Sequence, residues 1–376
     1  MRILHLGKYY APERGGIESY LRALSEWFVA RGHFVGALVH QRPGIWRSAR
    51  ETLDGVEIRR VACLGAPVYT PLSPTFPLHL ARALREMQPD LLHLHLPNPS
   101  CFAALASPRA RRLPWVVHWH SDIPSDAPDW RLRAGYRAYR PFEQAVLRRA
   151  HAIIATSQAY LDASSALAPW RAKAHVVPLG VDAVPSNAPQ DFWPAGSGPR
   201  LLAVGRLSHY KGFDVLIDAL AKTKDTRLLL VGEGECASAL RAQSRASGIA
   251  ERIRFAGALD DDALLAAYAA ADVFVLPSVN RGEAFGLVLL EAMRARLPVI
   301  ASDIAGSGIG DVVANGETAL LVAPNDADAL AAAIAKLDDA STRERLGTAG
   351  YRRWTERFTL ERSASAILAL YSALLR

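Results

Sequence analysis

The chain has 376 residues, of which 50% are hydrophobic and 22% charged, and its formal net charge is +7 at pH 7. This is the composition of a globular protein with room for two domains, and it excludes a disordered chain. No apolar run approaches the roughly 18 residues that span a bilayer, the N-terminus reads as a strand and not as a signal peptide, and three scattered cysteines argue against a disulfide framework. We expect a soluble, cytoplasmic protein, with the basic excess gathered in arginine-rich patches of the first half.

Strand-like apolar runs alternate with amphipathic helical stretches, which is the pattern of a parallel sheet wound with helices. In the first half, the predicted strands cover residues 2–6, 34–39, 91–96, 115–118, 152–156 and 175–178. A span rich in Pro, Gly and Ser follows at residues 183–199 and predicts an interdomain linker.

A second series of strands and helices begins after this span. Its predicted strands cover residues 200–204, 226–231, 252–255, 273–276, 298–302 and 319–322. Residues 351–376 predict one long amphipathic helix with no strand after it. We therefore predict an α/β fold of two doubly wound parallel-sheet domains. Residues 1–180 form the first, residues 181–355 the second, and a helix over residues 356–376 crosses back to pack on the first.

Ligands of open parallel sheets collect at the C-terminal ends of the strands, so the loops there are the places to search. The loop after the first predicted strand ends in Gly15-Gly16 at the start of a helix, which suits the close approach of a phosphate. It lacks the Gly-x-Gly-x-x-Gly fingerprint and the Lys-Ser/Thr ending of a P-loop, which disfavours a dehydrogenase or an ATPase. A simple glycine turn is the alternative.

The fourth predicted strand leads into His118-Trp119-His120. Alternation along a strand places His118 and His120 on one face, and His120, nearer the C-terminal end, is the better candidate to face a ligand. His93 and His95 lie on the preceding strand. A metal cluster of the four is disfavoured, because carboxylate or cysteine companions are missing.

The first strand of the second half ends in Gly205-Arg206, and Lys211 follows where a helix is predicted to begin. Arginine offers a planar fork of donors and lysine a compact charge, a combination suited to a diphosphate. Asp260-Asp261-Asp262 matches the metal-binding Asp-x-Asp pattern only formally, since it opens a helical run where capping is expected.

The most informative stretch places Glu283 and Gly286 between a strand and a helix, with Glu291 inside that helix. Free backbone N–H groups and the helix dipole favour an anion there, and the glycine lets a ligand approach the main chain. Two ordinary solvated acids on a surface helix are the alternative. Together with the basic pair and the glycine pair, the motif predicts a ligand with a diphosphate, a diol and sugar hydroxyls.

From Gly15-Gly16 through Arg206 and Lys211 to Glu283 and Glu291, the motif set resembles the retaining glycosyltransferases of family four, across essentially the whole chain. The resemblance implies the GT-B fold, two Rossmann-like domains that face each other across a cleft. It also implies a nucleotide diphosphate sugar as donor, and neither a cofactor nor a metal ion.

The resemblance assigns a role to each candidate residue. Two are catalytic, His120 beside the transferred sugar and Glu283 at its hydroxyls. The donor-binding residues are Gly15 and Gly16 at the phosphates, Arg206 and Lys211 at the diphosphate, Leu259 near the nucleobase, Phe285, Gly286 and Leu287 through backbone amides, and Glu291 at the ribose.

Residues 118–122 and 139–162 resemble bacterial mannosyl- and rhamnosyltransferases of exopolysaccharide and O-antigen synthesis. This favours a GDP-sugar over a UDP-sugar, and a glycan or polyprenyl-linked saccharide as acceptor. Peripheral contact with the anionic inner membrane is a further expectation, whereas nucleic acid is not an expected partner. The alternatives are a UDP-sugar-dependent transferase of the same fold, a nucleotide-sugar 2-epimerase, and a binding protein with a degenerate site.

Overall fold

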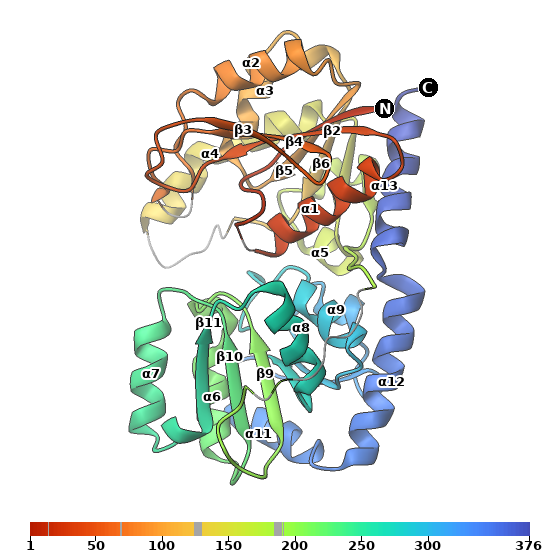
Figure 1. The fold of residues 1–376 in the computed structure, drawn as a ribbon. Helices are drawn as coiled ribbons and strands as arrows, with labels where there is room; N and C mark the ends of the chain where they lie inside the picture. Colours follow the sequence, from red (N-terminus) through yellow and green to blue (C-terminus); the bar gives the residue numbers. More distant parts are fainter. Residues whose placement is uncertain (14, 68–69, 124–129, 184–189, 191) are drawn as a thin grey trace. The chain divides into compact units, whose positions relative to one another are not determined.

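The computed structural model describes residues 1–376 except 14, 68–69, 124–129, 184–189 and 191 (Figure 1). The chain divides into two compact units, and each is described by itself. The first unit joins Met1–Gly180 with Leu360–Arg376, and the second is Val181–Thr359. Within the predicted linker, residues 184–189 and 191 lie outside the described residues.

The first unit is built on one sheet in the order β3-β4-β2-β1-β5-β6-β7-β8. Its strands are β1 Arg2–Leu6, β2 Phe34–His40, β3 Ala49–Leu53, β4 Val56–Val61, β5 Leu91–Leu96, β6 Trp115–Trp119, β7 Ala152–Ala155 and β8 Ala174–Val176. All pairs are parallel except β3 with β4. The six predicted strands of this half are confirmed.

The hairpin of β3 and β4 has no counterpart in the sequence prediction. Strand β3 is almost wholly exposed and rich in charged side chains, so it carries no apolar periodicity. The turn at Asp54-Gly55 has positive φ at both residues, as the type I′ turn requires. This dipeptide was the available signal for the hairpin.

Helices cover both faces of this sheet. They are α1 Gly16–Val29, α2 Phe76–Glu86, α3 Ala103–Ala106, α4 Trp130–Arg149, α5 Gln158–Ala163 and, from the end of the chain, α13 Leu360–Leu374. Helix α13 lies against α1 (Figure 1): the hydroxyls of Tyr20 and Ser363 are 2.7 Å apart, and the rings of Phe28 and Tyr371 lie 5.5 Å apart. The final helix therefore packs on the first unit.

The second unit has a six-stranded parallel sheet in the order β11-β10-β9-β12-β13-β14. Its strands are β9 Arg200–Val204, β10 Arg227–Val231, β11 Ile253–Gly257, β12 Val273–Leu276, β13 Val299–Ser302 and β14 Ala319–Val322. All six were predicted. Chain order reverses between β9 and β12, which makes their C-terminal ends the switch point of the sheet, where open α/β folds bind ligands.

The helices of the second unit flank this sheet. They are α6 Phe213–Ala221, α7 Ala237–Ala246, α8 Asp261–Ala270, α9 Leu287–Arg294, α10 Ile309–Val312, α11 Ala327–Lys336 and α12 Ala340–Arg357. The prediction of one helix over residues 351–376 is wrong. Helix α12 ends at Arg357 and is capped by Phe358, whose side chain is buried and whose carbonyl accepts the N–H of Val181, and α13 begins at Leu360.

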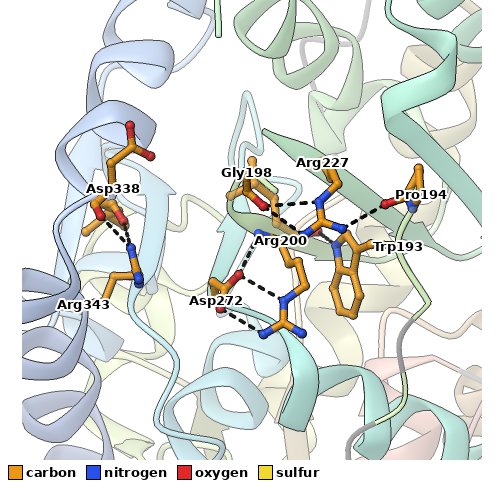
Figure 2. A network of polar contacts seen from close by, with 10 residues as sticks. Trp193, Pro194, Gly198, Arg200, Arg227, Asp272, Asp338 and Arg343 are labelled. Atoms are coloured by element: carbon orange, nitrogen blue, oxygen red, sulfur yellow. Dashed lines mark hydrogen bonds and ion pairs between the residues drawn. The ribbon is translucent and has the colours of Figure 1, made fainter. Parts of the chain in front are cut away.

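Hydrogen bonds hold the segment before β9, residues 193–198, against the N-terminal ends of the strands of this sheet (Figure 2). Arg227 donates hydrogen bonds to the carbonyls of Pro194 at 2.9 Å and Gly198 at 3.0 Å. Arg200 forms a bidentate ion pair with Asp272, with both N–O distances 3.1 Å. The indole of Trp193 donates to the carbonyl of Leu201. These contacts lie at the edge opposite the switch point, so they stabilise the unit and leave the C-terminal edge for ligands.

Candidate active site

Two loops meet at the switch point of the second sheet. One follows β9 and contains Arg206 and Lys211, and the other follows β12 and contains Glu283 and Gly286. The two loops are joined through their backbones, since the N–H of Val279 donates to the carbonyl of Tyr210 at 2.8 Å. The sequence prediction that both loops belong to one site is consistent with this contact.

Lys211 and Glu283 form a buried ion pair at the centre of these loops. The Lys211 Nζ lies 2.6 Å from Glu283 Oε2, and each residue is 7% exposed. Ser278 donates to the same carboxylate oxygen at 2.9 Å. Burial lowers the pKa of Lys211. Its electrostatic and hydrogen-bonding interactions with Glu283 and with Tyr210 have the opposite effect and raise the pKa above its ordinary value. Lys211 is therefore a cation held in place by a partner.

The approach of the two loops depends on Gly212. This residue has φ of +63°, and a Cβ at its position would lie 2.1 Å from the carbonyl oxygen of Pro277. Any side chain here would strain the backbone and push the β12 loop away. Gly212 also caps α6, so one glycine fixes both the helix start and the position of Lys211.

A third loop, which follows β13, forms hydrogen bonds with the segment around Glu283. Ser307 donates its hydroxyl to the Glu283 carbonyl, the N–H of Gly308 donates to the carbonyl of Ala284 at 2.8 Å, and Arg281 donates to the carbonyl of Gly306 at 3.1 Å. Because its backbone is held on both sides, Glu283 keeps its carboxylate in the switch-point loops.

Helix α9 begins immediately after these residues. Gly286 caps it with φ of +81°, a left-handed conformation that favours glycine, and Leu287 is its first residue. Phe285 is buried with its ring 6.3 Å from that of Phe358, which anchors the helix start. The first amides of an α-helix lack acceptors within the helix, and the dipole adds positive potential. This terminus can hold an anion beside Lys211.

Glu291 occupies a different environment, about one turn along from the start of α9. Tyr268 of α8 donates its hydroxyl to Glu291 Oε2 at 2.7 Å. Burial raises the pKa of Glu291, and the hydrogen bond from Tyr268 offsets part of that shift. Sequence reasoning missed Tyr268, whose only signal was a polar aromatic residue within the apolar run of α8.

Arg206 and Leu259 follow two strands, β9 and β11, that β10 separates in the sheet. Arg206 follows β9 and is exposed, and Leu259 is half-buried between β11 and α8. The capping prediction for the acidic triplet is confirmed, because the Asp260 side chain accepts the N–H of Ala263 at 2.8 Å. Of the predicted residues in this unit, the structure brings Lys211 and Glu283 into contact and gives Glu291 another partner.

The remaining candidates, Gly15, Gly16 and His120, belong to the first unit. Gly15 is the N-cap of α1 and Gly16 its first residue, after the loop that follows β1. A Cβ on Gly15 would meet only the carboxylate of Glu18, at 2.2 Å, which is the end of a flexible side chain that can turn aside. His120 follows β6 and is 5% exposed, as expected for a side chain at the strand end.

His120 belongs to a larger set of buried histidines on the same sheet. The predicted group of His93, His95, His118 and His120 is joined by His5, which sequence reasoning missed. The register pairs His5 with His93 and His95 with His118. A single histidine in the apolar strand β1 was the signal for this fifth member.

Comparisons with known proteins match both units. A family model described as "Glycosyl transferases group 1" matches residues 190–353, and one described as "Glycosyl transferase 4-like domain" matches residues 15–180. "D-rhamnosyltransferase WbpZ" of Pseudomonas aeruginosa is 32% identical, over 96% of this chain and 92% of its own length. "O-antigen chain mannosyltransferase C" of Escherichia coli is 28% identical, over 100% of this chain and 99% of its own.

Among solved structures, Anabaena HepE in complex with UDP-glucose superimposes with a TM-score of 0.77. The two chains are 21% identical, and the match covers 99% of each. At this identity the likeness shows a shared fold.

Proposed function

The chain belongs to the group 1 glycosyltransferases, a family with the GT-B fold, and we propose that it transfers a hexose from a GDP-sugar with retention of anomeric configuration, as in family four. The hexose is of the mannose or rhamnose type. The buried pair of Lys211 and Glu283 beside the N-terminus of α9 carries this proposal, since it unites a fixed cation, an acceptor for hydroxyls and a set of amides at one switch point.

The arrangement suits the charge changes of glycosyl transfer. As the sugar departs, positive charge develops on its ring and negative charge on the diphosphate. Lys211, Arg206 and the first amides of α9 stabilise the diphosphate, and this requires no metal ion. Lys211 remains charged before the donor arrives, because Glu283 balances it in the buried loops.

Glu283 then has two tasks in the proposal. It holds Lys211 through one carboxylate oxygen, and it accepts a hydrogen bond from a hydroxyl group of the donor sugar. The acceptor attacks from the same face as the departing diphosphate, whose oxygen takes the proton. A covalent adduct between the sugar and the protein, trapped and detected by mass spectrometry, would contradict this front-face mechanism.

The second carboxylate, that of Glu291, binds the nucleotide in this proposal. Glu291 faces the ribose diol, with Tyr268 fixing its orientation, and the segment with Leu259 borders the base. The donor preference is supported by relatives named as a rhamnosyltransferase and an O-antigen mannosyltransferase. The acceptor is a glycan or lipid-linked saccharide of a cell-surface polysaccharide.

Peripheral membrane binding belongs to the same proposal. Helix α4 exposes Arg133, Arg137 and Arg140 together with Trp130, which is 65% exposed, and Phe142, which is 54% exposed. Cationic and aromatic side chains on one helix favour an anionic interface. Among the described residues, no helix is both long and apolar enough to span a bilayer. Flotation with anionic vesicles should show binding that salt weakens, and vesicle binding that is absent at low salt would refute this part.

A donor screen tests the function. GDP-mannose and GDP should raise the melting temperature of the protein more than UDP-glucose and UDP do at equal concentration, because a ligand of the native state stabilises it by mass action. Stabilisation by the uridine compounds alone would mean that the donor is a UDP-sugar and not a GDP-sugar. Release of a free nucleotide-sugar isomer without any acceptor would identify a 2-epimerase instead.

A further inference from the structure

Three of the buried histidines form a continuous hydrogen-bonded chain across the first sheet. His5 Nδ1 lies 3.0 Å from His95 Nε2, and His95 Nδ1 lies 2.9 Å from His120 Nε2. The chain thus runs from β1 through β5 to the residue that follows β6. Helices α1 and α13 cover this face, with the ring of Tyr20 5.5 Å from that of His118 and the Tyr371 hydroxyl bonded to His93 Nδ1.

The rings of this chain are neutral. Burial lowers the pKa of His5 and of His120 to about 3, and burial together with the neighbouring histidines lowers the pKa of His95 well below its ordinary value. A neutral imidazole has one N–H donor and one acceptor nitrogen. Each ring can therefore donate in only one direction, and the three must all donate toward His120 or all toward His5.

The far end of the chain distinguishes the two directions. Among the described residues, His5 Nε2 is buried without a hydrogen-bond partner. If the rings donate toward His5, this nitrogen carries a buried N–H that has no acceptor, which proteins rarely tolerate. If they donate toward His120, it carries only a lone pair, and the hydrogen at the other end resides on His120 Nδ1, at the strand end.

We infer that His5 and His95 are positioning residues that fix the tautomer of His120, with the hydrogen on Nδ1 and the lone pair of Nε2 directed at His95. The nitrogen that the chain does not use is then a hydrogen-bond donor at the C-terminal edge of the sheet. In the transferase, and so resting on the proposed function, this N–H donates to an oxygen of a bound substrate. The opposite tautomer would present a lone pair to that oxygen.

His118 provides a matched control for the chain. It is fully buried on the same face, and its ring is stacked 4.4 Å from that of His120. Among the described residues, neither of its ring nitrogens has a hydrogen-bond partner. A His118→Leu variant therefore removes a neighbouring ring of the same size and burial without breaking the chain.

Nuclear magnetic resonance of protein labelled with ¹⁵N-histidine tests the inference directly, since protonated and bare ring nitrogens resonate at well-separated ¹⁵N frequencies. A His120→Gln variant assigns the His120 signals. We expect the hydrogen on Nδ1 in the wild type and in His118→Leu. His95→Asn should retain this tautomer, because its amide can still donate to His120 Nε2, whereas His95→Leu should give a mixture of both tautomers.

Transfer kinetics provide the second readout. His95→Leu should lower kcat by about tenfold, the value of one hydrogen bond to the reacting substrate, while His95→Asn and His118→Leu stay near the wild type. If His95→Leu does not fold, His5→Leu removes the far end of the chain and should likewise mix the tautomers.

A hydrogen on His120 Nε2 in the wild type would overturn the inference, as would an unchanged tautomer in the folded variants that break the chain. Stoichiometric zinc bound by these histidines would also overturn it, because a metal ion would occupy the nitrogens that the chain uses. If no nucleotide sugar is turned over while the tautomer of His120 still follows residue 95, the proposed function fails and the chain of histidines stands.

Discussion

Glu283 and Glu291 meet different partners, and this difference separates their proposed roles. Glu283 is bound to a buried cation and a serine hydroxyl, in loops held by backbone contacts. Glu291 lies on a helix and accepts from Tyr268. In the proposed reaction, the first carboxylate therefore belongs to the charged centre where the diphosphate departs, whereas the second, beside Tyr268, serves the nucleoside.

Neutral substitutions should separate the two carboxylates. Glu283→Gln should lower the kcat of transfer by about 100-fold with little change in GDP affinity, because it alters the charge beside the reacting centre. Glu291→Gln should weaken GDP binding by about tenfold, the value of one hydrogen bond to the ribose, with a smaller effect on kcat. Calorimetric titration with GDP and initial-rate kinetics measure the two effects.

Glu317→Gln is the matched control, since Glu317 is an exposed acid of the same unit. It should leave both GDP affinity and kcat unchanged, and circular dichroism should show all three variants folded. If Glu283→Gln and Glu291→Gln weaken GDP binding equally and leave kcat unchanged, the division of roles is wrong.

The individual site residues were partly predictable. Arg206, Lys211 and Glu283 stand out because charged residues follow strands or precede helices, where local pattern is informative, and Glu291 stands out as the acid inside the helix that comes next. The pairing of Lys211 with Glu283 was not predictable, because 72 residues separate them and only the strand order brings their loops together. His5 and Tyr268 were missed for the same reason.

At the scale of elements, buried strands were the most predictable part of the chain. Strands such as β5, β9 and β12 are apolar runs bounded by polar residues, and their hydrophobic pattern reflects burial on both faces. Strand β3 escaped prediction because an exposed edge strand has no such pattern. The sequence pattern also failed at the boundary between α12 and α13, where the amphipathic period continues through a turn fixed by Val181, far away in the sequence.

At the scale of the whole molecule, the buried histidines should make stability depend on pH. Burial lowers the pKa values of the five clustered histidines, to about 3 for His5 and His120, and it lowers the pKa of the buried His40 on β2 to about 4. The unfolded chain takes up protons near pH 6.5 and the native state does not, so this contribution to stability is complete above pH 6.5 and is lost as the pH falls. Glu143 acts oppositely, since burial raises its pKa to about 7 and the native state takes up its proton first.

We expect the free energy of unfolding to fall between pH 6.5 and pH 5, with each histidine contributing up to about 1.4 kcal/mol per pH unit once it is protonated in the unfolded chain. Urea denaturation at a series of pH values measures this slope. At pH 5, His118→Leu should reduce the slope of the unfolding free energy against pH by about 1.4 kcal/mol per pH unit, the value for one proton. A free energy of unfolding that stays constant over this range would show that the buried histidines do not control the pH dependence.

Proton NMR of the reaction with GDP-α-mannose distinguishes retaining transfer from a GDP-sugar from inversion and from use of a UDP-sugar. The spectrum follows donor consumption and identifies the anomer that forms first. We expect consumption of GDP-α-mannose with initial formation of the α-product, at a rate well above that with UDP-α-glucose. Initial formation of the β-product, or turnover of UDP-α-glucose without turnover of GDP-α-mannose, would contradict it.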